Sequence, residues 1–228
     1  MKKIAVTLIF IFTINLVVIG QENKISLGVT GSYDGYSLQK NQLFWNSQTY
    51  NTNLSFSSGL NLQYNFNKKI HLKSTMSYAK KGYDVTYNFL FIDPNDPAIP
   101  KRSVIKINTI NIPLMIGFYI KSNGKIKLSS SLGGVTEIVI NTSETSTYED
   151  NSTSAATSLS NSLPSLFLSV QFNAGIEYHV NEKIYIGLEP YFRYGFNTIN
   201  DAFMEFDPTS YGGFLSLNYK FSRKEKEE

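Results

Sequence analysis

The chain has 228 residues, enough for one β-barrel or β-sandwich or for two small domains. Charged residues make up only 17% of it while aromatic residues make up 14%, so something other than charge must cover much of its surface. The formal net charge of +3 comes from scattered Lys and Arg, which excludes a basic stripe for nucleic acid, and the absence of cysteine excludes disulfides, thiol catalysis, zinc–thiolate sites and lipidation on cysteine.

Residues 1–20 have the pattern of a secretory signal peptide. The basic start "MKK" precedes an apolar stretch from Ile4 to Ile19, and Val18 and Gly20 suit the −3 and −1 positions of a cleavage site. We expect cleavage after Gly20, with an uncleaved anchor helix as the alternative.

Beyond residue 20 the sequence predicts strands and no transmembrane helix. Most of the predicted strands alternate apolar and polar residues, which is the two-residue period of a strand. In "LSFSSGLNLQYNF" (54–66) the apolar side chains alternate only with Ser, Gly, Asn and Gln. An uncharged polar face of this kind suits a closely packed interior better than a surface in water. The eight predicted strands lie near 24–36, 54–66, 70–85, 104–120, 125–139, 166–180, 184–196 and 210–221.

The connections between these strands alternate strictly between long and short. The short ones are "NKK" (67–69), "KSNG" (121–124) and "NEK" (181–183), and the long ones are 37–53, 86–103, 140–165 and 197–209. Tight turns at one end and long loops at the other are typical of outer-membrane barrels. The sequence therefore predicts an all-β fold, an eight-stranded antiparallel up-and-down transmembrane β-barrel over 21–221, followed by a charged periplasmic tail at 222–228.

Outward-facing aromatic residues are expected at both membrane interfaces. Near the short turns they are Tyr64, Phe66, Phe118, Tyr178, Tyr219 and Phe221, and near the long loops they are Tyr33, Phe56, Tyr78, Tyr194 and Phe196. Two prolines, Pro113 and Pro190, fall inside predicted strands. Because proline has no amide hydrogen to donate, each is expected to mark a bulge or a local opening between strands.

Several segments resemble the PorT-like outer-membrane β-barrel proteins of Bacteroidota. The resemblance covers 21–221, and its most specific parts are the cluster Tyr78, Lys81, Gly82, the triplet Ile112, Pro113, Leu114 and the run Arg193, Tyr194, Gly195. It implies an eight-stranded barrel in the outer membrane, mostly without an assigned activity. Fold transfers more safely than function along such a resemblance.

Charged residues at inward-facing positions predict a polar network in the lumen. Buried charges need partners, so Glu189 and Arg193, which share a strand, are each expected to pair with a charge on a neighbouring strand. Eight strands enclose a lumen that side chains fill, so we expect no general-diffusion pore. The expected network consists of Lys73, Lys81, Glu137, Glu177, His179, Glu189 and Arg193.

Catalysis is not expected. The only histidines, His71 and His179, lie beside short turns and face inward, and Glu177 shares a face with His179 as a hydrogen-bonding partner would. The sequence predicts no cofactor and no metal site, and "DPNDP" (93–97) is expected to be a stiff turn because its spacing matches no EF-hand loop.

The long loops offer the remaining candidate for function. Phe44, Trp45 and Tyr50 could form a surface contact for a partner or glycan, or anchor in lipid headgroups. Twelve of the residues 141–164 are Ser or Thr, a composition that predicts poor compact folding.

We expect a structural or binding role at the cell envelope. A lipid-modifying enzyme and a soluble periplasmic ligand-binding barrel are the alternatives. The expected partners are outer-membrane lipid, the barrel-assembly machinery during insertion and an unidentified envelope protein, without nucleic acid.

Overall fold

The computed structural model describes the backbone of residues 25–41, 48–52, 54–87, 100–148, 150–155, 157–158, 165–196, 199–201 and 204–221. The expected signal peptide (1–20) and charged tail (222–228) lie outside these residues. Within the described ranges, no helix is long and apolar enough to span a membrane.

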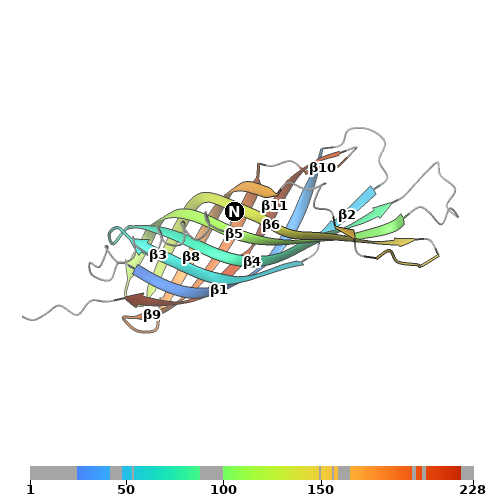
Figure 1. Cartoon of the computed structure of the whole chain (residues 1–228). Coiled ribbons are helices and arrows are strands. Elements are labelled where there is room, and N and C mark those ends of the chain that lie inside the picture. The colour runs from blue at the N-terminus through green and yellow to red at the C-terminus, as the bar shows by residue number, and fades with distance from the viewer. Residues whose placement is uncertain are drawn as a thin grey trace, which may run out of the picture.

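Eight long antiparallel strands form a closed ring (Figure 1). Neighbours in the chain are neighbours in the ring, and pairing of the last strand with the first closes it, from Ile25 with Phe221 to Asn41 with Glu205. The predicted all-β, eight-stranded up-and-down barrel is confirmed. The strands of the ring are β1 (Ile25–Asn41), β3 (Leu54–Asn65), β4 (Ile70–Tyr87), β5 (Pro100–Asn123), β6 (Ile126–Tyr148), β8 (Leu166–His179), β9 (Ile184–Gly195) and β11 (Met204–Phe221).

The ring is staggered, as a barrel with tilted strands must be. Following paired residues from Ile25 through each strand in turn leads back to β1 at Gly35 instead of Ile25. Paired residues on neighbouring strands therefore lie at slightly different depths along the barrel axis.

The short turns are closed by local polar groups. The Asn67 side-chain oxygen accepts hydrogen bonds from the amides of Lys69 and Ile70 at 2.7 and 2.9 Å. Asn181 does the same for Lys183 and Ile184 at 2.9 and 2.8 Å, and the third turn uses Gly124 at a φ of 64°. Asn and Gly are favoured in such turns because they satisfy the backbone or adopt positive φ.

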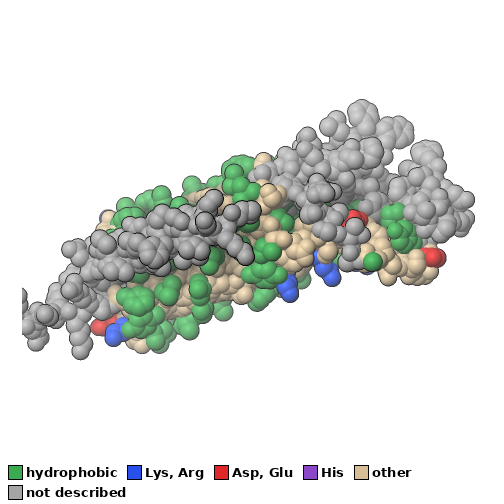
Figure 2. All heavy atoms as spheres, viewed as in Figure 1, with side chains coloured by type: hydrophobic (Ala, Val, Ile, Leu, Met, Phe, Trp, Pro, Cys, Tyr) green, Lys and Arg blue, Asp and Glu red, His purple; other side chains and the backbone are tan. Residues whose placement is uncertain are grey.

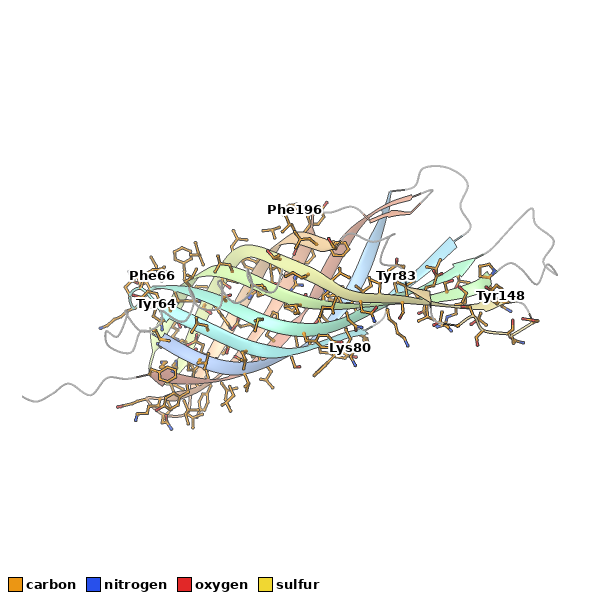
Figure 3. All side chains as sticks on the ribbon, in the orientation of Figure 1. Tyr64, Phe66, Lys80, Tyr83, Tyr148 and Phe196 are labelled. Atoms are coloured by element: carbon orange, nitrogen blue, oxygen red, sulfur yellow. The ribbon has the colours of Figure 1, made fainter. Side chains whose placement is uncertain are left out.

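The barrel is apolar outside and polar inside. Leu60 on β3 is 51% exposed on the outer wall, whereas the next residue, Asn61, is 2% exposed and faces the lumen. Figure 2 shows apolar side chains covering the outer wall of the barrel. Most of the expected interfacial aromatics are exposed, and Figure 3 places Tyr64 and Phe66 at the short-turn end and Phe196 toward the other end.

Both strand prolines interrupt the pairing locally without shifting its register. Between β4 and β5 the paired residues stop at Ser74 with Leu114 and resume at Ser77 with Asn111, which skips Pro113. Between β8 and β9 they stop at Asn173 with Tyr191 and resume at Ile176 with Leu188, which skips Pro190. Of the two predicted outcomes, the prolines produce local openings and not bulges, because only one donor is missing at each site.

At the long-loop end the strands continue past the ring as two flaps. The long flap consists of 83–87 of β4, 100–107 of β5 and 142–148 of β6, with β2 (Gln48–Thr52) paired to β4 and β7 (Thr157–Ser158) paired to β6. The short flap consists of the ends of β1 and β11 with β10 (Ile199–Asp201). Both project beyond the barrel in Figure 1.

The expectation that 141–164 would not fold compactly is wrong for its first half. β6 continues to Tyr148 and then turns back, with the Tyr148 amide donating to the Ser152 carbonyl at 3.0 Å and Thr147 bridging to Thr153. Pairing with β5 supplies the order that the Ser/Thr-rich composition lacks, because tertiary context overrides local composition.

Candidate functional site

The candidate site is the polar network in the lumen, to which every wall strand contributes inward-facing residues. Most of its side-chain contacts between different strands do not join neighbours but skip one strand of the ring. Inward-facing side chains converge on the axis of so small a barrel, so a residue meets the second strand along more readily than its direct neighbour. The network has three groups along the axis.

The first group lies toward the long-loop end and centres on Glu137 of β6. Lys81 of β4 donates to both carboxylate oxygens of Glu137, at 2.8 and 2.7 Å, and Arg193 of β9 forms an ion pair with the same carboxylate. The Arg193 Nε also donates to Gln171 of β8 at 2.9 Å, and Gln171 donates to Asn173 at 2.8 Å. All three charged side chains are buried, so two cations share one carboxylate.

The second group lies in the middle of the barrel, where Lys73 of β4 forms an ion pair with Glu189 of β9. These strands are opposite each other in the ring, so the pair crosses the lumen. Asn173 donates to the other Glu189 oxygen at 3.2 Å. The expectation that Glu189 and Arg193 would pair with neighbouring strands is wrong, because the charges that they meet lie across the lumen or two strands away.

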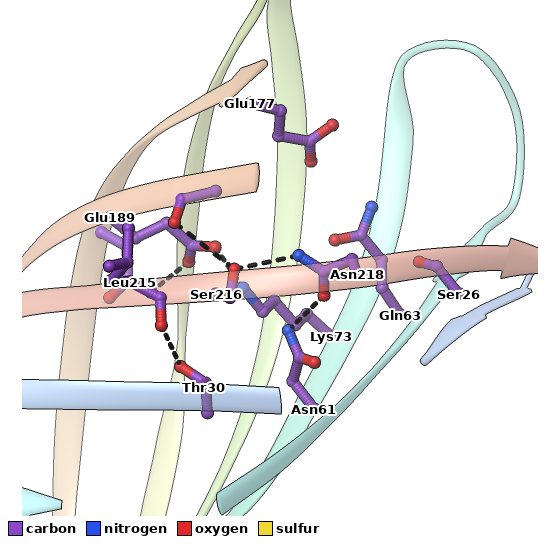
Figure 4. A network of polar contacts seen from close by, with 12 residues as sticks. Ser26, Thr30, Asn61, Gln63, Lys73, Glu177, Glu189, Leu215, Ser216 and Asn218 are labelled. Atoms are coloured by element: carbon purple, nitrogen blue, oxygen red, sulfur yellow. Dashed lines mark hydrogen bonds and ion pairs between the residues drawn. The ribbon is translucent and has the colours of Figure 1, made fainter. Parts of the chain in front are cut away.

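A chain of amides and hydroxyls accompanies this ion pair (Figure 4). Asn61 of β3 donates to Asn218 of β11 at 2.7 Å, and Asn218 donates to Ser216 at 3.0 Å. Gly28 on the strand between them permits this contact, because a Cβ there would lie 2.3 Å from Asn218 and 2.5 Å from Asn61. The glycine is therefore needed for close approach.

The third group lies at the short-turn end and directs its donors to Glu177 of β8. Tyr119 donates to Glu177 at 2.8 Å and itself accepts from Gln63 at 2.8 Å. His179 Nε2 lies 3.3 Å from the other Glu177 oxygen, and Lys220 Nζ lies 3.1 Å from His179 Nδ1. Lys220, His179 and Glu177 thus form a chain of polar contacts at this end.

His71 lies apart from these bonds. Its ring packs 4.8 Å from that of Tyr119, and within the described part of the chain its Nδ1 has no hydrogen-bonding partner. Gly117 makes room for it, since a Cβ at that position would lie 2.1 Å from His71 Nε2.

The structure thus brings together the predicted interior residues in three sets. Lys81, Glu137 and Arg193 form one, Lys73 and Glu189 another, and Glu177 and His179 the third. Among the described residues, no group of three His, Cys, Asp or Glu side chains is placed to hold a metal ion. Charged, hydrogen-bonded side chains across the lumen are suited to sealing and stiffening a barrel.

The predicted surface residues are only partly described. Phe44 and Trp45 lie outside the described residues, as does the "DPNDP" turn. Tyr50 lies on β2, where its backbone pairs with Val85 of the long flap, and its side chain is outside the described set. At the tip of that flap, hydrogen bonds from Ser152 lower the pKa of the exposed Asp150 carboxyl and so favour its negative charge.

Sequence reasoning missed the tyrosines of the lumen. Tyr119 links Gln63 to Glu177, Tyr185 lies 2.9 Å from Ser26, and Tyr191 stacks on Phe214 at 4.7 Å between ring centroids. The signal was present, because all three are at odd-numbered positions of strands whose even-numbered residues face outward. The sequence-based prediction places aromatic residues only at the membrane interfaces.

Comparison with known proteins agrees with this architecture. The model of the outer membrane protein beta-barrel domain family matches residues 19–201. The crystal structure of the outer membrane protein OprG from Pseudomonas aeruginosa is similar with a TM-score of 0.52 at 13% identity, covering 90% of this chain and 99% of that one. Neisserial surface protein A gives a TM-score of 0.46 at 12% identity, covering 86% and 97%. These likenesses concern the fold alone, and comparison with curated proteins gives no significant match.

Proposed function

Because the chain belongs to the outer membrane protein beta-barrel domain family, we propose that it is a PorT-like member with a structural or binding role at the cell envelope, and not a general-diffusion pore. The observation that carries this proposal is the network of ion pairs across the lumen. Lys73 and Glu189 join opposite walls, and the hollow beside Lys81, Glu137 and Arg193 measures only about 20 Å³. That is close to the space of one water molecule.

The proposed orientation puts the short turns in the periplasm and both flaps at the cell surface. It supposes that the signal peptide is cleaved after Gly20 and that the barrel-assembly machinery inserts the mature chain. Longer connections on the outer side are the rule among outer-membrane barrels. The soluble periplasmic alternative is not retained, because every strand of the ring carries large apolar side chains exposed on its outer face.

The flaps are the proposed contact surface for an envelope partner. In the β4 and β5 part of the long flap the polarity of the sheet is the reverse of that in the barrel. Tyr83, Val85, Ile105 and Ile107 are buried on its inward face, and the exposed Arg102 and Lys106 lie on its outward face. The β6 part keeps a polar inward face, because Thr142 and Glu144 are paired with Ile107 and Ile105 on that face. Apolar-inside, polar-outside sheets belong in water, which suits a surface that meets other molecules.

An enzymatic role is not proposed. Both histidines lie at the short-turn end, and His179 is held between Glu177 and Lys220. Outer-leaflet lipid would be at the opposite end of the barrel in the proposed orientation.

Planar-bilayer recording tests the closed lumen. The purified protein should give no large, steady conductance, because charged side chains cross the lumen at two levels. The double variant Lys73→Ala, Glu189→Ala removes the central pair and should give more frequent small openings than the wild type. Reproducible porin-sized openings of the wild type would contradict the proposal.

A further inference from the structure

The short-turn end of the lumen carries a basic hollow beside the third group of the network, with Lys220 and His179 in its lining. Its volume is about 590 Å³, and Lys125, Lys127, Lys183 and Lys220 line it together with one carboxylate, Glu182. Two of the short turns, 124–125 and 180–183, form its rim.

The positive charge of this hollow is not balanced locally. Lys220 Nζ contacts His179 and lies 5.2 Å from the Tyr185 ring, and Lys127 Nζ lies 5.0 Å from the Tyr119 ring. Within the described ranges, Lys125, Lys127 and Lys183 form no ion pair. Glu177 lies directly across from Lys127 on the neighbouring strand, and its carboxylate already contacts Tyr119 and His179. Four ammonium groups beside the carboxylates of Glu182 and Glu177 leave a net positive charge, which attracts an anion. Lysine acts as a point charge and suits phosphate in particular.

An apolar groove lies on the outer wall at the same end. Its volume is about 340 Å³, and its lining includes Leu27, Val29, Leu60, Ile184, Leu217 and Tyr219. It crosses β9, β11, β1 and β3 and extends from the strand ends toward the middle of the wall. A groove with this lining fits a hydrocarbon chain.

The hollow and the groove meet at the ends of β9 and β11. Lys183 and Lys220 line the hollow, and the adjacent residues Ile184 and Tyr219 line the groove. The Lys220 amide donates to the Lys183 carbonyl at 2.7 Å, which fixes these strand ends together. Only this rim separates the charged site from the apolar one.

We propose that the short-turn end binds an anionic phospholipid, with its phosphate at the basic hollow and one acyl chain in the adjoining groove. The joined groove favours a lipid over a soluble phosphate, and the exposed Tyr178 and Tyr219 place the lysines just beyond an interfacial aromatic belt. The assignment of this lipid to the periplasmic leaflet rests on the proposed orientation, whereas the binding itself does not depend on it.

Native mass spectrometry of the full chain in detergent, with phosphatidylglycerol or phosphatidylcholine added, tests the site. Wild type should retain phosphatidylglycerol in preference to phosphatidylcholine. The double variant Lys125→Gln, Lys183→Gln should retain about tenfold less of it, because each basic residue near a membrane surface contributes substantially to binding of anionic lipid. The matched control Lys68→Gln, Lys69→Gln removes the same charge from the short turn 67–69, which does not line the hollow. It should leave retention within about twofold of wild type.

The groove is tested with Val29→Trp, which fills it from the lipid-facing wall. Lipid retention should fall, while binding of inorganic phosphate, followed by chemical shifts of the rim lysines, should stay unchanged. Equal loss in both lysine variants, or equal retention of the two lipids, would overturn the proposal. If inorganic phosphate displaces the lipid and Val29→Trp has no effect on lipid retention, the ligand of the hollow is a soluble anion and not a lipid.

Each variant is first checked for folding by the heat-dependent shift of its electrophoretic mobility. Conductance in planar bilayers tests separately whether the lumen is closed. A failure of the proposed function can therefore be distinguished from a failure of the lipid site.

Discussion

At the scale of single residues, the interior depends on side chains that serve more than one partner. Glu137 forms ion pairs with both Lys81 and Arg193, and Glu177 contacts both Tyr119 and His179. Removing a shared acceptor therefore takes one partner from two donors at once. Such losses are far larger than those of exposed ion pairs.

Glu137→Gln should be strongly destabilising, because it leaves two buried cations beside a neutral amide. We expect a loss of about 3–5 kcal/mol in the free energy of unfolding, measured by urea titration in detergent micelles or lipid vesicles. The control Glu144→Gln changes a carboxylate of the same strand that is only partly buried in the long flap, and it should cost less than about 1 kcal/mol. Similar costs for both would mean that the triad is not an interdependent unit.

Gly117→Ala tests the packing around His71. The new methyl group would lie 2.1 Å from His71 Nε2, so the ring has to move against Tyr119. Overpacking of this kind costs about 1–3 kcal/mol, observable in the same urea titration. Gly134→Ala on β6 is the matched control, since its nearest atom would be 4.0 Å away, and it should be close to neutral. A neutral Gly117→Ala would show that His71 is not fixed where the structure places it.

At the scale of the element, one β-strand changes environment along its length. Leu54 and Leu60 lie on the outer face of β3, with exposures of 67% and 51%. Leu60 pairs with Val29 and Met76 within the apolar wall, while Leu54 pairs with Gly35 at the long-loop end of the strand. The same substitution at the two positions therefore reports depth in the bilayer.

Leu60→Lys should cost about 2–4 kcal/mol and impair assembly, whereas Leu54→Lys should cost at most about 1 kcal/mol, because the penalty of a lipid-facing lysine falls toward the interface. Folded protein in the outer-membrane fraction and urea midpoints in vesicles measure both. Equal tolerance of the two would mean that this face of β3 does not contact lipid.

The long flap carries the other change of environment. Ile105→Ala on its buried inner face should speed hydrogen exchange of the flap amides, since a core isoleucine truncated to alanine costs about 2–5 kcal/mol. Lys106→Ala, the next residue on the exposed outer face, should leave exchange almost unchanged. Fast exchange already in the wild type would show that the flap is not a folded extension of the barrel.

At the scale of the whole molecule, the barrel and its flaps define two chemically different ends. The short-turn end carries the basic hollow, and the long-loop end carries the long flap with its buried apolar residues on β4 and β5. Which end faces the cell exterior therefore determines what each can meet.

Single engineered thiols report this orientation without background, because the chain contains no cysteine. Ser152→Cys at the exposed tip of the long flap should react with a membrane-impermeant maleimide in intact cells. Glu182→Cys in the exposed turn 180–183 should react only after the outer membrane is permeabilised. The opposite labelling pattern would show that the barrel is inserted with its short turns outward.

The sequence alone determined the strand number, the inside-out polarity and the alternation of long and short connections. These are local properties, since period two is visible within "LSFSSGLNLQYNF" and turn residues act over a few positions. It also placed Lys73, Glu189 and the other charged residues on the inner face, because phase along a strand is a one-dimensional property.

Only the tertiary structure decided which of these residues meet. The partner of Glu189 depends on the stagger accumulated around the ring, and no segment of sequence contains that quantity, so Lys73 on the opposite wall was not predicted. The flaps were missed for a related reason. The Ser/Thr-rich stretch after Asn141 becomes β6 because β5 pairs with it over its length, and pairing between strands distant in sequence is what local composition does not record.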